Sequence, residues 1–308
     1  MSPRDPLRDA LENVRAAGAV SVPPWLSVVS ALASARPATV GDTIDWLVAH
    51  RDALTAADAE SRAAPLTMSP LDEDLRYEPE LAQLDRARGD HSLRDKHLFA
   101  DLVGRRSFFQ VTVYAITGIE LSASDAEMLE RIGVANVAAD HRAWPLTVTR
   151  RVAGHGGDLC ASVVAGAAVM ASPLIGSTAG AGAARLLRRV EAAVARGESL
   201  ASVLDAMLAR RETLLGFGRP VMGPDERVAP VQEAMRAHGR GDGAQVRLLR
   251  DIEAHLVARK GIRSNVAAWV AAVMGDLGFT PDHVHAVTNV YLHVCVLAQA
   301  VYSAERAR

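Results

Sequence analysis

The sequence predicts an all-α protein, and three observations support this fold class. Apolar residues make up 49% of the 308 residues while aromatic residues make up only 4%, and Ala and Leu dominate the apolar share. This mixture favours helices over strands. Apolar side chains recur at helical spacing through most of the chain, and we find no convincing strand-like alternation and no internal repeat.

Composition and charge argue against several classes of partner. The formal net charge of −2 gives no reason to expect nucleic acid or an anionic membrane. Residues 1–20 are charged and lack the long apolar stretch of a signal peptide, so we expect a cytoplasmic protein. Cys160 and Cys295 both lie in apolar runs, and we expect small core residues in a reducing compartment. Residues 159–184 are uncharged and long enough to span a bilayer, but their Gly, Ser and Pro content favours a buried helix pair.

Helix signals divide the chain into two parts. Residues 1–96 carry weak helical patterns between charged, proline-containing stretches, and we expect divergent N-terminal helices and surface loops there. Beyond residue 96, Gly118 is expected to end a helix, Ser124 to open one through a capping box, and Thr280 with Pro281 to open the last. The expected helices cover residues 111–117, 124 onward, 183–195, 200–215, 228–237, 244–258, 265–276 and 281–304.

The loop at residues 216–227 interrupts this helical pattern. Three glycines permit tight backbone paths and two prolines stiffen them, around a small group of charged side chains. Such a loop in a helical protein usually holds polar groups in fixed positions. We therefore expect Arg219 and Arg227 to line a ligand site. The alternative is that they only cap helix ends and pair with Asp225 or Glu226.

The loop resembles the active-site loop of citrate synthases and citryl-CoA lyases. The resemblance rests on Gly216-Phe217-Gly218 with Val221, followed by Asp225 and Arg227. Four further segments are similar to family motifs and occur in the family's order: Gly104-Arg105-Arg106-Ser107-Phe108, Ala139-Asp140-His141, Ser172-Pro173-Leu174-Ile175-Gly176-Ser177-Thr178-Ala179, and Lys260-Gly261-Ile262-Arg263-Ser264-Asn265-Val266-Ala267.

The resemblance covers roughly residues 100–306 and implies an architecture. Residues 97–308 would form a citrate synthase-like helical region, with a smaller helical domain at roughly 190–275 inserted in a larger one. The active-site cleft would lie between the two, residues 1–96 would be a divergent addition, and the protein would be a homodimer. The substrates would be a CoA thioester and a keto acid or dicarboxylate, with no covalently bound cofactor.

The departures from the family pattern fall on the chemistry. In the family's carbon–carbon bond reaction a base removes a proton from the acyl-CoA methyl group, and donors bind both carbonyl oxygens. The resemblance puts Ala267 in the place of the aspartate base, and Ile175 and Arg219 in the places of two histidines. Alanine and isoleucine side chains neither move protons nor donate hydrogen bonds. Arg219 still donates hydrogen bonds, but it cannot cycle a proton at neutral pH.

The anion-binding part of the family pattern is retained. By resemblance, Arg227 would grip a substrate carboxylate and His141 would contact the substrate and assist catalysis. His293 stands near the place of a family arginine, and it is otherwise an ordinary core histidine. Lys260 and Arg263 would reach the CoA phosphates. We expect Arg219, Arg227 and His141 to converge on one cleft.

The replacement base is open among four candidates, and so is catalysis itself. His155 and Asp158 share a glycine-rich turn and are otherwise loop residues; Glu226 and His293 are the other two candidates. The first hypothesis is an acyl-CoA-dependent enzyme of the citrate synthase type with rearranged catalytic groups. The second is an inactive paralogue that binds a CoA ester, a dicarboxylate or a partner subunit. The scattered histidines give no metal-binding pattern.

Overall fold

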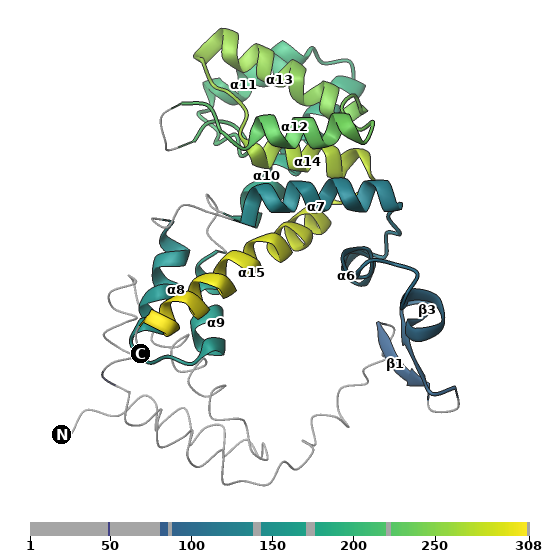
Figure 1. Ribbon diagram of the computed structural model, residues 1–308. Coiled ribbons are helices and arrows are strands. Elements are labelled where there is room, and N and C mark those ends of the chain that lie inside the picture. Colours follow the sequence, from purple (N-terminus) through teal and green to yellow (C-terminus); the bar gives the residue numbers. More distant parts are fainter. Residues whose placement is uncertain are drawn as a thin grey trace, which may run out of the picture. The chain divides into compact units, whose positions relative to one another are not determined.

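The computed structural model describes residues 81–85, 88–137, 143–170, 176–219 and 223–306, together with Ala49 (Figure 1). Contacts divide the chain into Met1–Pro79 and Glu80–Arg308, and all described residues except Ala49 belong to the second part. The helices expected within residues 1–79 lie outside the described residues. The assignment of residues 1–96 to a separate N-terminal region therefore stays a prediction, as does the inserted small domain.

Ten α-helices in the described chain confirm the all-α class (Figure 1). They are α6 (Phe108–Thr117), α7 (Ala123–Val137), α8 (Trp144–Gly154), α9 (Leu159–Val169), α10 (Ser177–Ala195), α11 (Leu200–Ala209), α12 (Val228–Ala237), α13 (Ala244–Lys260), α14 (Val266–Asp276) and α15 (Pro281–Arg306).

A small antiparallel sheet precedes the helices and corrects the expectation that no strand is present. It consists of β1 (Ala82–Asp85), β2 (Asp90–Leu93) and β3 (Lys96–His97), in that order, and is followed by a π-helix, η1 (Leu98–Leu102). The strands are short and largely polar, so they show no alternation of apolar side chains. The buried Asp90 carboxylate accepts hydrogen bonds from the amides of His91, Phe99 and Ala100 instead.

Helix-terminal residues explain where several helices begin and end. Ser107 and Gln110 form a capping box at the start of α6, and Gly118 ends that helix in the left-handed region at φ 75°, as predicted. The predicted start at Ser124 is wrong by one position, because α7 begins at Ala123. The hydroxyl of Ser122, not Ser124, accepts a hydrogen bond from the Asp125 amide. Periodicity alone does not show which of several neighbouring serines acts as the cap.

α11 is shorter than the predicted helix over residues 200–215. It ends at Ala209, and Arg211 adopts a left-handed conformation at φ 55°. Leu214 is nevertheless buried in the core. The apolar spacing thus continues beyond the helix because the following turn also packs inward.

The main core surrounds α14, whose residues are buried on nearly every side. α10 packs against both α14 and α15, and α15 also contacts α7, α8 and α9, as its diagonal course in Figure 1 shows. Close packing requires small residues here. An added Cβ at Gly166 would lie 2.0 Å from Thr149 Oγ1, and one at Gly182 would lie 2.2 Å from Leu215 Cδ1. The Gly166 contact brings α9 close to α8, and the Gly182 contact brings α10 close to the turn at Leu215.

Two expectations about apolar segments need correction. Cys295 is buried as expected, but Cys160 is exposed on α9, so it is not a core residue. Leu159 and Val164 on the same helix are also exposed, so α9 is not fully buried. Among the described residues, α15 is the helix that is long and apolar enough to cross a membrane. Core helices meet the same criterion, and Val284, Val287 and other residues of α15 belong to the core.

Candidate functional site

Backbone hydrogen bonds fasten the loop at 216–227 to the segment that leads into α14. The Gly218 amide donates to the Arg263 carbonyl and the Asn265 amide donates to the Gly216 carbonyl, both at 2.8 Å. Phe217 and Ser264 form an isolated antiparallel bridge between these bonds. Two segments that carry separate sequence motifs therefore lie side by side.

Asn265 ties the loop and the helix together through its side chain. Its Nδ2 donates to the Gly218 carbonyl at 2.8 Å, and its Oδ1 caps α14 by accepting from the Ala267 amide at 3.0 Å. Asparagine is among the preferred residues at this position of a helix. One side chain thus fixes both the register of the loop and the start of α14.

Gly216 is required by the same arrangement. Its φ is 90°, and an added Cβ would lie 2.7 Å from the Ala183 Cβ and 3.0 Å from the Ala268 Cβ. The loop backbone therefore passes directly between α10 and α14, where no side chain fits.

Asp225 is the buried centre of the charged group. Its side chain is 1% exposed and accepts a bidentate pair from Arg227, with both N–O distances at 2.9 Å. Its second oxygen also accepts from the Val266 amide at 3.0 Å, at the first turn of α14. Burial alone would raise the pKa of Asp225, but the hydrogen bonds from Arg227 and from the Val266 amide outweigh it and hold the pKa at about 2. Asp225 is therefore ionised.

Arg219 also lies near the Asp225 carboxylate. Its Nη1 lies 3.9 Å from Asp225 Oδ1 and 2.6 Å from Glu226 Oε2, and it donates to the Pro224 carbonyl at 3.0 Å. The Arg219 guanidinium lowers the pKa of Glu226. We call Arg219, Asp225, Glu226 and Arg227 the loop cluster. Both arginines lie at the Asp225 carboxylate and make the Asp225 and Glu226 pairs of the alternative interpretation. The expected cleft shared with His141 stays a prediction.

The residues at the family's catalytic positions are only partly described. Ala267 lies half-buried in the first turn of α14, beside the loop, so no carboxylate occupies that position. His141 and Ile175 lie outside the described residues, and their predicted roles stay predictions.

The other candidate bases make local contacts. The ring Nδ1 of His155 lies 2.8 Å from the Arg151 carbonyl, and Asp158 caps α9 by accepting from the Ala161 amide at 2.8 Å. His293 is exposed on α15, with Nδ1 2.9 Å from the Asn289 carbonyl, so it is not a core histidine. In the described chain, none of the hydrogen bonds of these three residues reaches the loop cluster.

Lys260, the last residue of α13, and Arg263, on the segment that follows this helix, are both exposed. The backbone carbonyl of Arg263 accepts the hydrogen bond from the Gly218 amide. The Arg263 guanidinium makes no hydrogen bond to another described residue. Both side chains thus stay candidates for binding phosphates.

A supporting network behind the loop was missed from the sequence. Glu253 Oε1 accepts from the amide and the hydroxyl of Ser264, at 2.8 and 2.7 Å. The indole of the buried Trp269 donates to the same hydroxyl at 2.8 Å. No motif links these three residues in sequence, because they come from α13, the loop and α14. They hold the strand-like segment at 263–265 against the core.

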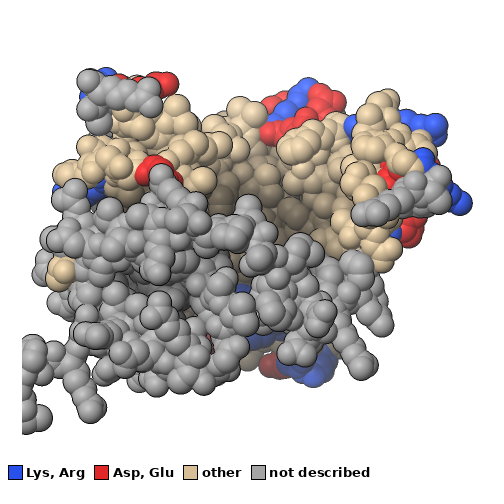
Figure 2. Space-filling model, turned by 90° about the horizontal axis from the view of Figure 1, so that it is seen from below, with Lys and Arg blue, Asp and Glu red and all other residues tan. Residues whose placement is uncertain are grey.

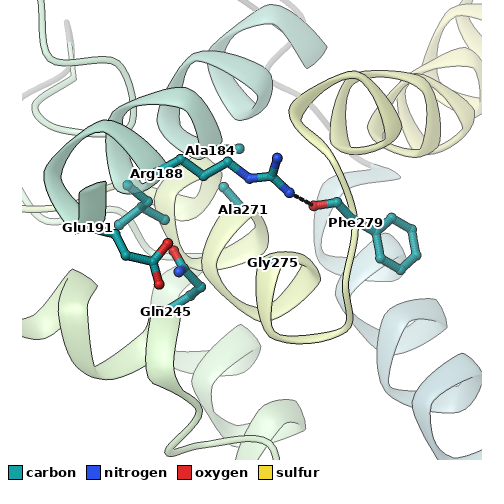
Figure 3. Close-up of a pocket in the computed structure, with 8 residues that line it drawn as sticks. Ala184, Arg188, Glu191, Gln245, Ala271, Gly275 and Phe279 are labelled. Atoms are coloured by element: carbon teal, nitrogen blue, oxygen red, sulfur yellow. Dashed lines mark hydrogen bonds between the residues drawn. The ribbon is translucent and has the colours of Figure 1, made fainter. Parts of the chain in front are cut away.

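The described chain also contains a cavity of about 390 Å³ between α10, α13 and α14. Arg188 lies at its edge and donates to the Phe279 carbonyl at 3.0 Å, while the Glu191 carboxylate and the Gln245 amide point toward each other (Figure 3). None of its lining residues belongs to the loop cluster. The cluster is therefore a separate feature.

Other classes of site have little support within the described residues. On the face in Figure 2, the visible Lys and Arg side chains lie beside Asp and Glu side chains in small groups. Pairs such as Arg250–Asp242 and Arg210–Glu212 are of this kind. Among the described residues no group of three or more His, Cys, Asp or Glu side chains is placed to hold a metal ion.

Comparison with known proteins identifies related folds. The sequence profile described as citrate synthase, C-terminal domain, matches residues 27–308. The structure is similar to that of a citryl-CoA lyase from Hydrogenobacter thermophilus, with a TM-score of 0.65 and 20% identity over 74% of this chain and 87% of that one. No curated protein matches the chain significantly.

Two longer proteins share the same fold. An ATP citrate lyase from Methanosaeta concilii, in complex with (3S)-citryl-CoA, gives a TM-score of 0.58 and 18% identity over 82% of this chain and 40% of that one. A citrate synthase from Thermotoga maritima gives a TM-score of 0.50 and 18% identity over 65% of this chain and 53% of that one. At these identities the similarity concerns the fold.

Proposed function

The chain belongs to the citrate synthase family, and on this premise we propose that it binds an acyl-CoA thioester together with a keto acid or dicarboxylate and makes or breaks a carbon–carbon bond between them. One observation carries the proposal. Arg219 and Arg227 converge on Asp225 at the N-terminus of α14, in the segment where family members hold their substrate. Paired guanidinium groups are well suited to carboxylates.

The site can polarise oxygen atoms better than it can move protons. Every hydrogen bond that Arg219 makes to a described residue comes from Nη1, so its Nε and Nη2 groups are available to a substrate carbonyl or carboxylate. Glu226 has a lowered pKa, which suits a counter-charge rather than a base. His155, Asp158 and His293 remain the candidate bases.

A second candidate function is an inactive paralogue that binds a CoA ester, a dicarboxylate or a partner subunit. Ala267 favours it, because the first turn of α14 presents a methyl group where the family's reaction needs a carboxylate base. The loop cluster would then bind its ligand without turning it over.

One experiment separates these functions. The protein is incubated with citryl-CoA, malyl-CoA or acetyl-CoA plus oxaloacetate, while thioester absorbance and free thiol are followed. Arg219→Ala and Arg227→Ala should each lower turnover about 10- to 100-fold, because each removes a charge-assisted hydrogen bond of about 1.5–3 kcal/mol. Arg236→Ala is the matched control, since that exposed arginine pairs with Glu233 on α12.

The outcomes differ for each function. Turnover lost in the two loop variants and kept in the control supports the enzyme. Thermal stabilisation by ligand without turnover supports the inactive paralogue. The absence of both responses to every ligand would refute a CoA ester or carboxylate site.

We also propose a cytoplasmic homodimer. Exposed apolar side chains on α9 and α15 support the dimer, because faces of this kind are common at subunit interfaces. Light scattering of the purified chain tests the dimer, and a monomer at micromolar concentration would contradict it. The exposed apolar residues are Leu159, Val164, Val294, Leu297 and Val301.

A further inference from the structure

We infer that Glu226 is a specificity-determining residue, an internal carboxylate that occupies Nη1 of Arg219 and must leave before a ligand carboxylate can pair with that group. The inference rests on the proposed function, since it assumes a carboxylate ligand at the loop cluster. Glu226 Oε2 lies 2.6 Å from Arg219 Nη1 and is 72% exposed, whereas the Arg219 side chain is 20% exposed. The carboxylate therefore covers the guanidinium from the solvent side.

The charges of the loop cluster cancel while Glu226 is in place. Arg219 and Arg227 contribute two positive charges, and Asp225 and Glu226 contribute two negative ones. A neutral cluster attracts a dissolved anion weakly. If Glu226 turns into solvent, the cluster carries one net positive charge and can pair with a ligand.

Only one of the two carboxylates can leave at low cost. Asp225 is 1% exposed, makes a bidentate pair with Arg227 and accepts from the Val266 amide. Glu226 has a single described hydrogen-bond partner for its side chain, Arg219, and that side chain is 72% exposed. An exposed ion pair of this kind contributes little free energy, so a ligand can displace it.

The exchange selects among ligands by their charge. When a monocarboxylate replaces Glu226, one carboxylate at Arg219 is exchanged for another, so little binding free energy is gained. A ligand with two or three carboxylates brings further charges for the remaining N–H groups of Arg219 and Arg227. Glu226 therefore favours polycarboxylates and CoA esters of dicarboxylic acids over simple acids.

The test is the affinity of full-length Glu226→Gln for citrate, measured by isothermal titration calorimetry at low ionic strength. Glutamine keeps an oxygen that can accept from Arg219 but lacks the charge. We expect the Kd for citrate to fall about three- to fivefold, the magnitude of an exposed ion pair. Glu233→Gln is the matched control. It makes the same charge change on α12, at a carboxylate 2.6 Å from Arg236 and away from the loop cluster, and its Kd should equal that of the unmodified protein.

Each other result has a distinct meaning. An unchanged or higher Kd in Glu226→Gln, with citrate still bound, overturns the inference and leaves the proposed function standing. An equal fall of the citrate Kd in both variants also overturns the inference, because the overall charge of the protein would then explain the gain in affinity. If citrate binds neither the unmodified protein nor Glu226→Gln, the carboxylate site itself fails, and the inference fails with it.

Discussion

Asp225 should be the residue whose charge stabilises the loop most, and Asp225→Asn isolates that charge. Asparagine has nearly the same shape and can still accept a hydrogen bond from the Val266 amide. It cannot form the charged bidentate pair with Arg227, whose two N–O distances are 2.9 Å. The variant also leaves Arg227 without its described carboxylate partner.

The magnitude follows from the pKa of Asp225. The ordinary value is 3.8 and the folded value is about 2. At about 1.36 kcal/mol for each pH unit, this difference of about 1.8 corresponds to about 2.4 kcal/mol of folding free energy. The side chain is almost wholly buried, so solvent screening reduces this value little. A loss of that size should lower Tm by about 3–5 °C in a chain of this length.

The depressed pKa of Asp225 determines how its contribution to folding stability changes with pH. Because the folded pKa is depressed, the contribution of Asp225 is fully present above the unfolded value of 3.8 and is lost as pH falls through about 2. Urea unfolding of the unmodified protein and of Asp225→Asn at several pH values measures the contribution of Asp225 to the free energy of unfolding. The difference in unfolding free energy should be constant above about pH 5 and should shrink as the pH is lowered below about 4.

Asp242→Asn is the control for this experiment. Its carboxylate lies 3.1 Å from Arg250 and 3.5 Å from Arg247, but it is 74% exposed, so we expect a loss below about 1 kcal/mol. Equal losses in the two variants, or a loss in Asp225→Asn that does not change with pH, would refute the assignment of a buried, ionised Asp225.

Two further predictions concern packing. Gly216→Ala should destabilise the protein by about 2–4 kcal/mol in urea unfolding, because of positive φ and the overlap with α10 and α14. Gly218→Ala has the same backbone problem at φ 72° in open space and should lose only about 1 kcal/mol; similar losses in both would contradict the close approach. Tyr291→Phe should lose about 1 kcal/mol, because the buried hydroxyl donates to the Leu129 carbonyl at 2.9 Å. The exposed Tyr302→Phe should change unfolding by less than about 0.5 kcal/mol, and a larger loss there than at Tyr291 would argue against the buried hydrogen bond.

The sequence was most informative where local chemistry decides the backbone. Gly118 and the Thr280-Pro281 pair predicted helix ends because capping depends on a few adjacent residues. The three-stranded sheet at 82–97 was not predicted, because the buried Asp90 carboxylate stabilises it through hydrogen bonds to backbone amides. The pattern of apolar residues does not reveal such bonds.

The candidate site was predictable in position and only partly in pairing, because the alternative interpretation paired the two arginines with Asp225 or Glu226. The resemblance identified the loop and the start of α14, which the structure joins by backbone hydrogen bonds. It did not predict that Asp225 would be buried between two arginines, or that Glu253 and Trp269 would support Ser264. A side chain's partners depend on which distant segments meet it, and one sequence does not contain that information.

The hydrogen bonds that build the site are largely independent of the side chains that would do its chemistry. Gly218 to Arg263 and Asn265 to Gly216 are bonds between backbone groups, so they depend on the glycines and the chain path. The side chains at 219 and 267 take no part in them. A histidine or an aspartate at those positions can therefore be replaced without dismantling the loop. We therefore expect the loop geometry to be kept when the side chains at 219 and 267 are substituted, so turnover and ligand binding, not the fold, identify the reaction.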